Sequence, residues 1–356
     1  MVVGELKQYV CETIKGDTIY VSSMPNFTLG GLIKSKTTIP LDFTPIINAD
    51  LSKALLEIGV TAPREKFLWR LKVNGVPIAR EFKPQVVARL KNRIFAKVVY
   101  DISPVLKSPG NSRKNRVNVT IKYEGSDRIV IEHIGLLAFY SCDDALGNVS
   151  LLSGALALEP GEVAKVNLKH PQGLSVSGTL RTMLILPNPK ARTTISFNNN
   201  HTAKIEGVIG GDEVLLHVDN ITEDNVVEIR HEEPVTQYYP KELLVSSILL
   251  SQTQYNEPKL EIVDIKYPEK LGRGDKIKVT IANKGVSKPD KAVLTLMVRG
   301  QTVFQEKIEL LEPGQQTTVE VPVNLPKGEH QLVFRTIWRK LAKTSFNEKR
   351  INVNVD

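Results

Sequence analysis

The chain has 356 residues, of which 41% are hydrophobic and 24% are charged, with 47 Lys and Arg against 39 Asp and Glu. This composition is typical of a folded globular protein and excludes a disordered or collagen-like chain. The two cysteines exclude a disulfide-rich scaffold and a cysteine-ligated metal cluster. No apolar run approaches the ~20 residues of a membrane span. The length predicts two or three domains.

Apolar residues recur at every second position over short runs, as in 70–75 (RLKVNG), 116–123 (RVNVTIKY) and 276–283 (KIKVTIAN). A period of two is typical of strands with one buried face. Turn signals such as Asn74-Gly75 separate the runs. Two stretches, 50–57 and 240–249, are candidates for short helices, and the second reads equally well as a strand. The pattern predicts an all-β chain of tandem β-sandwiches.

Two segments of the chain resemble each other in their spacing. Pro63 and Asn74 bracket one hairpin-like segment, and Pro187 and Asn198 bracket another at the same internal spacing. The strands predicted at 117–121 and 225–229 also align, with a longer connection before the strand in the first copy. Either a duplication or the general similarity of sandwich halves accounts for this match. A duplication predicts a first domain over residues 1–142 and a second over 143–252.

The segment YDISPVL…NRVNVTI, within 100–121, resembles a pattern of galactose-binding-like jelly rolls. In that pattern a strand runs into an Asp, a Ser or Thr and a small helical turn, then returns as an alternating strand after an Asn. Asp101 is expected to accept backbone amide hydrogen bonds in the turn. The resemblance implies two jelly-roll-like sandwiches but not sugar binding, because one fold hosts many functions.

Residues 256–356 carry a second resemblance. The matching elements are Gly274-Asp275 before a strand, the turn at Lys284-Gly285, Pro313-Gly314 before another strand, and Gly328 before a further strand. Together they resemble CARDB, an immunoglobulin-like cell-adhesion-related domain of bacteria and archaea. The turn glycines are expected to need positive φ. The resemblance implies an interaction or spacer module of prokaryotic style with no catalytic residues to transfer.

Charge is segregated along the chain. Residues 1–142 carry 21 basic and 12 acidic side chains, 143–253 carry 8 and 14, and 254–356 carry 18 and 13. The first domain is therefore predicted to be basic and the second acidic. The positive excess of the first domain is concentrated between Arg64 and Arg116, where 14 side chains are basic and three are acidic.

Two groups within this run are candidate binding residues. Arg89, Lys91 and Arg93 alternate, so on a strand they would share one face. The loop 107–116 adds four more basic residues, which are Lys107, Arg113, Lys114 and Arg116. Together they predict a surface for a polyanion, a glycan or an acidic protein, including a second copy of this chain. The alternative is a solvated surface beside a flexible loop. Nucleic acid is not favoured, because the nearby aromatic residues occupy core-like positions.

Catalytic and metal-binding signals are weak. The six histidines do not stand at chelating spacing, and no nucleotide-binding or nucleophile motif is present, so no cofactor or metal is predicted. Trp69 and Trp338 alternate with strand residues and are predicted to lie in cores rather than on a sugar-binding surface. Cys11 and Cys142 lie near the first and last strands of the first domain and are a candidate disulfide, with two free thiols as the alternative.

The function that these features favour is a non-catalytic structural or interaction protein that binds through its basic first domain. The alternative is a carbohydrate-binding protein that uses a jelly-roll groove. As written, the chain begins without an export signal, which favours a cytoplasmic location. Removal of a leader would instead indicate a cell-surface or extracellular protein.

Overall fold

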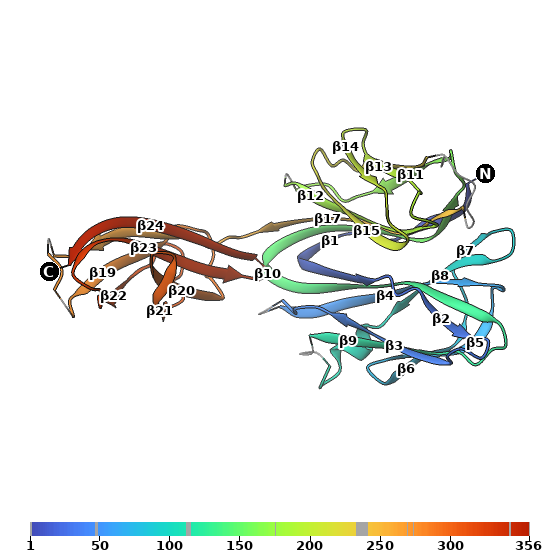
Figure 1. Ribbon diagram of the computed structural model, residues 1–356, viewed down its shortest axis with the longest axis horizontal. Helices are drawn as coiled ribbons and strands as arrows, with labels where there is room; N and C mark the ends of the chain where they lie inside the picture. Colours follow the sequence, from blue (N-terminus) through green and yellow to red (C-terminus); the bar gives the residue numbers. More distant parts are fainter. Residues whose placement is uncertain are drawn as a thin grey trace. The chain divides into compact units, whose positions relative to one another are not determined.

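The computed structural model describes residues 2–46, 49–111, 115–174, 176–232, 241–268, 270–272, 274–341 and 343–355. Almost all regular structure in them is β-strand, and the one described helix is α1 (Ser103–Lys107). The chain divides into two compact units (Figure 1). The first contains Met1–Pro45 and Asp50–Gln254, and the second contains Ile46–Ala49 and Tyr255–Asp356. The predicted all-β class with tandem sandwiches is confirmed.

A nine-stranded sheet organises the first unit. Its main path runs through β15 (Gly210–Val218), β12 (Gly178–Leu186), β17 (Leu243–Tyr255), β10 (Arg128–Leu158), β4 (Asp50–Ala62), β8 (Ile94–Asp101) and β7 (Val86–Arg89). β1 (Val3–Ser23) and β2 (Phe27–Gly30) also pair with β10. β10 has 31 residues and runs antiparallel to β1 along nearly all of β1 (Figure 1). Because β10 passes through residue 142, the predicted boundary, the first two sandwiches share a continuous strand.

One outer sheet covers each half of this central sheet. The first outer sheet contains β3 (Lys36–Asp42), β9 (Arg116–Lys122), β5 (Phe67–Val73) and β6 (Val76–Phe82). The second contains β11 (Val163–Lys169), β16 (Asp224–His231), β13 (Thr193–Phe197) and β14 (His201–Ile205). Two separate hydrophobic cores result, one with Trp69 and Leu56, the other with Phe197 and Leu184. We call each half of the central sheet, together with the outer sheet that covers it, a sandwich: the first contains β3, β9, β5 and β6, and the second contains β11, β16, β13 and β14.

The two halves of the central sheet also pack against each other. Val99 and Phe139 of the first half share a hydrophobic cluster with Met183 and Leu249 of the second. β4, β8 and β17 are therefore largely buried on both faces, and their sequences are nearly continuous apolar runs. The helix candidates at 50–57 and 240–249 fall on β4 and, from Leu243, on β17. Burial on both faces removes the alternation that marks a strand.

Asn74 and Asn198 occupy equivalent positions in the two sandwiches. Both follow a strand with positive φ, 48° and 49°. Oδ1 of Asn74 accepts a hydrogen bond from the amide of Asn118 at 2.9 Å, and Oδ1 of Asn198 accepts one from the amide of Val226 at 2.8 Å. The alignment of 117–121 with 225–229 places Asn118 opposite Val226. The matching hydrogen bonds support an internal duplication.

The turn after β8 has the expected cap. Oδ1 of Asp101 accepts hydrogen bonds from the amide of Ser103 at 2.8 Å and from its hydroxyl at 2.5 Å. These two bonds hold the pKa of Asp101 below its ordinary value. The role predicted for Asp101 as an acceptor of backbone amides is confirmed.

The second unit is a two-sheet sandwich with its own core. One sheet contains β18 (Leu260–Lys266), β19 (Lys276–Asn283) and β22 (Gln316–Pro322), and the other β21 (Gln301–Lys307), β20 (Lys291–Val298), β23 (Gly328–Lys340) and β24 (Lys343–Val355). Trp338 lies in this core. Gly314 has the expected positive φ of 80°. At Gly285 the requirement is space instead, since a Cβ there would lie 2.3 Å from the Lys259 nitrogen.

The predicted disulfide between Cys11 and Cys142 is wrong. Both cysteines are free. In the pairing of β1 with β10, Cys11 stands opposite Ser150, whereas Ser141 stands opposite Gly16. Cys142 therefore lies several residues along the ladder from Cys11, beyond the reach of a disulfide.

Candidate functional site

The predicted basic strand face does not form. β7 ends at Arg89, and the amide of Leu90 donates to the carbonyl of Arg93 to close a hairpin into β8. Arg89 forms an ion pair with Glu65, Arg93 forms one with Glu242, and Lys91 is exposed in the turn. The expectation that Arg89, Lys91 and Arg93 share one strand face is wrong, because the chain reverses between them.

The predicted basic loop is described only at its ends. Lys107 is exposed at the end of α1, and Arg113 and Lys114 lie outside the described residues. Arg116 begins β9, and its Nε donates to Oδ1 of Asp42 at 2.5 Å. This contact lowers the pKa of the Asp42 carboxyl and raises that of Arg116. Binding by the loop stays a prediction, and Arg116 is already neutralised locally.

Basic side chains gather on the outward face of the first outer sheet. Lys36 of β3 and Arg70 of β5 both stand directly opposite Lys122 of β9, on its two sides. Like charges at directly opposed positions destabilise a sheet by up to ~1 kcal/mol a pair. Among the described residues, Lys122 alone of the three has an ion-pair partner, Glu124 at 2.6 Å. We call Lys36, Lys122 and Arg70 the basic row.

An open groove of about 1050 Å³ lies beside the basic row. Its basic lining residues are Arg64, Lys66, Arg70, Lys72, Arg80 and Lys122. Two acidic residues, Glu81 and Glu124, also line it. Leu68, 76% exposed, adds an apolar surface on the same strand as Arg70 and Lys72. We call this the basic groove.

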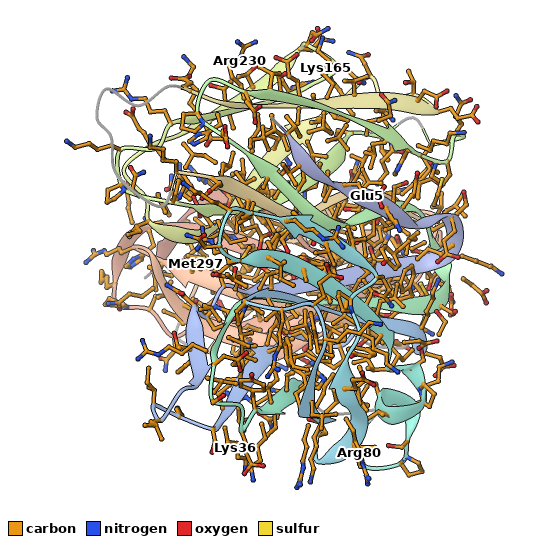
Figure 2. The ribbon with its side chains drawn as sticks, turned by 90° about the vertical axis from the view of Figure 1, so that its right-hand side faces the viewer. Glu5, Lys36, Arg80, Lys165, Arg230 and Met297 are labelled. Atoms are coloured by element: carbon orange, nitrogen blue, oxygen red, sulfur yellow. The ribbon has the colours of Figure 1, made fainter. Side chains whose placement is uncertain are left out.

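Each outer sheet carries both paired and unpaired basic side chains. On the second outer sheet, Lys165 and Arg230 both contact Glu228, at 3.6 and 3.2 Å. On the first, Lys36 and Arg80 have no ion-pair partner among the described residues. Figure 2 shows Lys165 and Arg230 at one side of the first unit and Lys36 and Arg80 at the opposite side. Lys169 and Lys204 of the second outer sheet are also exposed without an ion-pair partner among the described residues, so the excess of positive charge in the first sandwich follows from the number of its basic residues.

The sequence count identified the concentration of basic residues in the first domain, but no pattern in the sequence predicted the direction of Lys36 or Arg80. The pairing that brings Lys36 beside Lys122 was missed, because it joins strands far apart in the chain. The aromatic residues are placed as predicted. Trp69 is 2% exposed and Trp338 is 7% exposed, so both are core residues.

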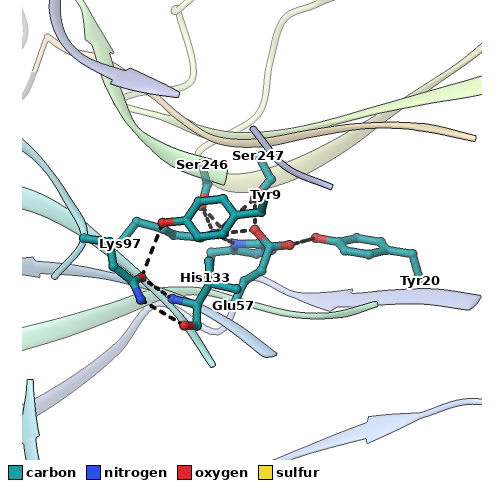
Figure 3. A network of polar contacts seen from close by, with 9 residues as sticks. Tyr9, Tyr20, Glu57, Lys97, His133, Ser246 and Ser247 are labelled. Atoms are coloured by element: carbon teal, nitrogen blue, oxygen red, sulfur yellow. Dashed lines mark hydrogen bonds and ion pairs between the residues drawn. The ribbon is translucent and has the colours of Figure 1, made fainter. Parts of the chain in front are cut away.

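A second polar cluster is enclosed where the two halves of the central sheet meet (Figure 3). Glu57 of β4, Lys97 of β8 and His133 of β10 are each 0% exposed. Ser246 and Ser247 of β17 reach this cluster from the second sandwich and are equally buried. We call these five residues, with Tyr20, the buried network.

Lys97 lies at the centre of the buried network. Its Nζ lies 2.6 Å from Nδ1 of His133, 2.7 Å from Oγ of Ser246 and 3.3 Å from Oε2 of Glu57. The hydroxyl of Ser247 donates to Oε2 of Glu57 at 2.6 Å, and that of Tyr20 donates to Oε1 at 3.1 Å. The carboxylate therefore has a partner on each oxygen.

Burial shifts the protonation of the buried network. Desolvation lowers the pKa of Lys97 to about 8, against the attraction of Glu57. Desolvation and the positive charge of Lys97 hold the pKa of His133 well below its ordinary value, so neutral His133 accepts from Lys97. Tyr20 is the most exposed member at 8%. The network is enclosed in this structure, and its hydrogen bonds join strands of the two sandwiches.

Within the described ranges, no three His, Cys, Asp or Glu side chains stand close enough together to hold a metal ion. No helix in the described part of the chain is long and apolar enough to cross a bilayer.

No protein-family model matches this chain, and no curated protein sequence is similar to it. Among solved structures, the Endo-D glycoside hydrolase domain of Streptococcus pneumoniae is 9% identical, with 58% of this chain and 33% of that chain covered and a TM-score of 0.19. A beta-galacturonidase from Eisenbergiella tayi is 10% identical, with 58% and 36% covered and a TM-score of 0.23. The beta-glucuronidase of Ruminococcus gnavus is 13% identical, with 59% and 34% covered and a TM-score of 0.19. The chain thus spans about a third of these proteins, and similarity this low assigns no activity to it.

Proposed function

We propose that this protein is a non-catalytic binding protein and that the basic groove of its first sandwich holds an extended anionic partner. The observation that carries the proposal is the basic row. Lys36, Lys122 and Arg70 stand at adjacent positions across three strands with one carboxylate, Glu124, beside them. An anion bound over this face would relieve the mutual repulsion of the three cations.

The form of the groove favours a polymer with repeated negative charges. Neighbouring strands lie about 4.8 Å apart, and residues on one face of a strand repeat about every 6.8 Å. Arg70 and Lys72 are spaced in this way along β5, with Lys122 on the neighbouring strand. Such a lattice of donors suits sulfate, carboxylate or phosphate groups carried at regular intervals.

Two further features support the proposal, one against catalysis and one against a neutral carbohydrate ligand. The buried network holds the strongly shifted titratable groups Lys97 and His133, and it is closed to solvent. The alternative of a neutral carbohydrate groove would gain from an exposed stacking surface. Trp69 lines the groove but is only 2% exposed, and Trp338 is 7% exposed.

The test replaces Arg70 and Lys72 together with Glu and measures binding to a sulfated polysaccharide, heparin, over a range of salt concentrations. We expect wild-type binding that weakens with salt, and a variant at least ten-fold weaker, since each charge-assisted hydrogen bond contributes ~1.5–3 kcal/mol. Lys91→Glu, in the exposed β7–β8 turn, is the matched control and should bind like the wild type.

Equal binding by the double variant and the wild type would refute the groove as the site. Weaker binding by Lys91→Glu alone would place the site at the β7–β8 turn instead of the groove. Salt-insensitive binding to neutral dextran would favour the carbohydrate alternative. Polyglutamate and double-stranded DNA at matched charge separate an acidic peptide or a nucleic acid from a polysaccharide.

A further inference from the structure

An apolar loop tip projects from one end of the first sandwich, in the turn between β2 and β3. Leu32 is 108% exposed relative to its reference state and Ile33 is 58% exposed. Leu32 has φ of 70°, a conformation in which a bulky side chain costs ~1–3 kcal/mol. Neither burial nor backbone preference explains a leucine there, and an exposed apolar pair of this kind is typical of a contact with a partner outside the chain.

The tip stands beside the basic groove. The amide of Gly31 donates to the carbonyl of Gly125, which lines the groove, at 3.1 Å. The amide of Tyr123, at the end of β9, donates to the carbonyl of Ser35 at 2.8 Å. The loop tip and the basic row are therefore parts of one surface.

Positive charge surrounds the tip. Lys34 is exposed and its Nζ lies 4.9 Å from the centre of the Phe27 ring. The side chain of Arg128 lies against Gly31. Among the described residues, Lys34, Lys36 and Arg128 have no carboxylate within ion-pair distance. Of the acidic residues nearby in sequence, Asp127 forms an ion pair with Arg64 at 3.0 Å and Glu124 forms one with Lys122 at 2.6 Å.

We propose that this surface docks on a membrane with anionic headgroups, with Leu32 and Ile33 inserted among the lipids. The proposal rests on the proposed function, because the same basic surface supplies the attraction. A projecting pair of apolar side chains needs no shaped pocket to enter lipid, whereas a protein partner would have to provide one. Apolar insertion and a ring of Lys and Arg are the two contributions that hold peripheral proteins on anionic bilayers.

The test uses the full chain and vesicles of phosphatidylcholine, alone or with phosphatidylserine. We expect co-sedimentation with the anionic vesicles only. Leu32→Asn combined with Ile33→Ser should weaken binding at least ten-fold, from the loss of two buried apolar side chains. Asn tolerates positive φ, so the variant should fold as the parent does. Lys36→Glu should weaken binding at least five-fold.

Ile209→Ser is the matched control, because Ile209 is 67% exposed in the second sandwich and lies away from the basic row. It should bind vesicles like the wild type. Ile33→Trp provides a direct readout of insertion, since both native tryptophans are buried. Its emission should shift to the blue with anionic vesicles.

Three outcomes would overturn the inference. Unchanged vesicle binding by the Leu32→Asn and Ile33→Ser variant would mean that the tip does not insert. Wild-type binding to the sulfated polysaccharide but not to anionic vesicles would reject the membrane and leave the proposed function standing. Binding to neither probe would reject both.

Discussion

Replacement of Lys97 by Met should destabilise the first unit by about 3–5 kcal/mol, the cost of breaking a buried ion pair from one side. Met retains most of the volume but removes the Nζ contacts with Glu57, His133 and Ser246. The carboxylate of Glu57, 0% exposed, keeps only the hydroxyl donors Ser247 and Tyr20. Glu57→Gln should cost a similar amount, because it leaves the ammonium group without a counter-charge. The two changes together should cost about 0.5–3 kcal/mol less than the sum of the single changes.

Urea unfolding followed by tryptophan emission measures this cycle. Trp69 lies in the core of the first unit and Trp338 in that of the second. A Trp338→Phe background therefore leaves one reporter, for the first unit alone. Lys72→Met is the matched control on the exposed face of β5 and should change the free energy of unfolding by less than about 0.5 kcal/mol. A cost below about 1 kcal/mol for Lys97→Met, or strict additivity in the double variant, would refute the reasoning.

Acid should destabilise the first unit, because burial lowers the pKa of His170 to about 4. Below pH ~6.5 the unfolded chain takes up a proton on this histidine, whereas His170 in the folded protein stays neutral down to about pH 4. The free energy of unfolding therefore falls as the pH falls below ~6.5, by about 3 kcal/mol at pH 4. The same urea assay should show this loss, which His170→Gln should reduce and which a flat profile between pH 7 and pH 4 would contradict. A fragment of residues 256–356 should fold alone because the second unit has its own hydrophobic core. Circular dichroism should show a cooperative melt, and an unfolded spectrum would mean that this core depends on the rest of the chain.

The number of buried faces decides which strands the sequence predicts well. β5, β9 and β19 bury one face and alternate strictly, and they were readable from sequence. β4 and β17 bury both faces along most of their length, and from their continuous apolar runs a helix could be predicted as readily as a strand. Their second buried face exists because the central sheet packs on itself, which local periodicity does not encode.

The candidate site was predictable in composition but not in assembly. The excess of basic residues between Arg64 and Arg116 lies in the same domain as the proposed groove, and the alternation around Leu71 and Val73 leaves Arg70 and Lys72 on one face of β5. The pairing of Lys36 with Lys122 depends on the sheet order. Arg89 and Arg93 were misassigned because a hairpin turn interrupts the alternation. A lysine at position 97 inside an apolar run was a signal of the buried network, but its partners come from three other strands.

The position of β17 in the central sheet determines when the first unit folds during synthesis. β17 lies between β12 and β10, although it is the last strand of the unit in sequence. The faces of β4 and β8 that pack against β17 therefore stay uncovered until residues 243–255 have left the ribosome. At ~5–20 residues per second, about 150 further residues take on the order of ten to thirty seconds. During that interval the apolar faces and strand edges that β17 covers in the folded unit stay exposed, which is when an exposed strand edge can pair with another chain.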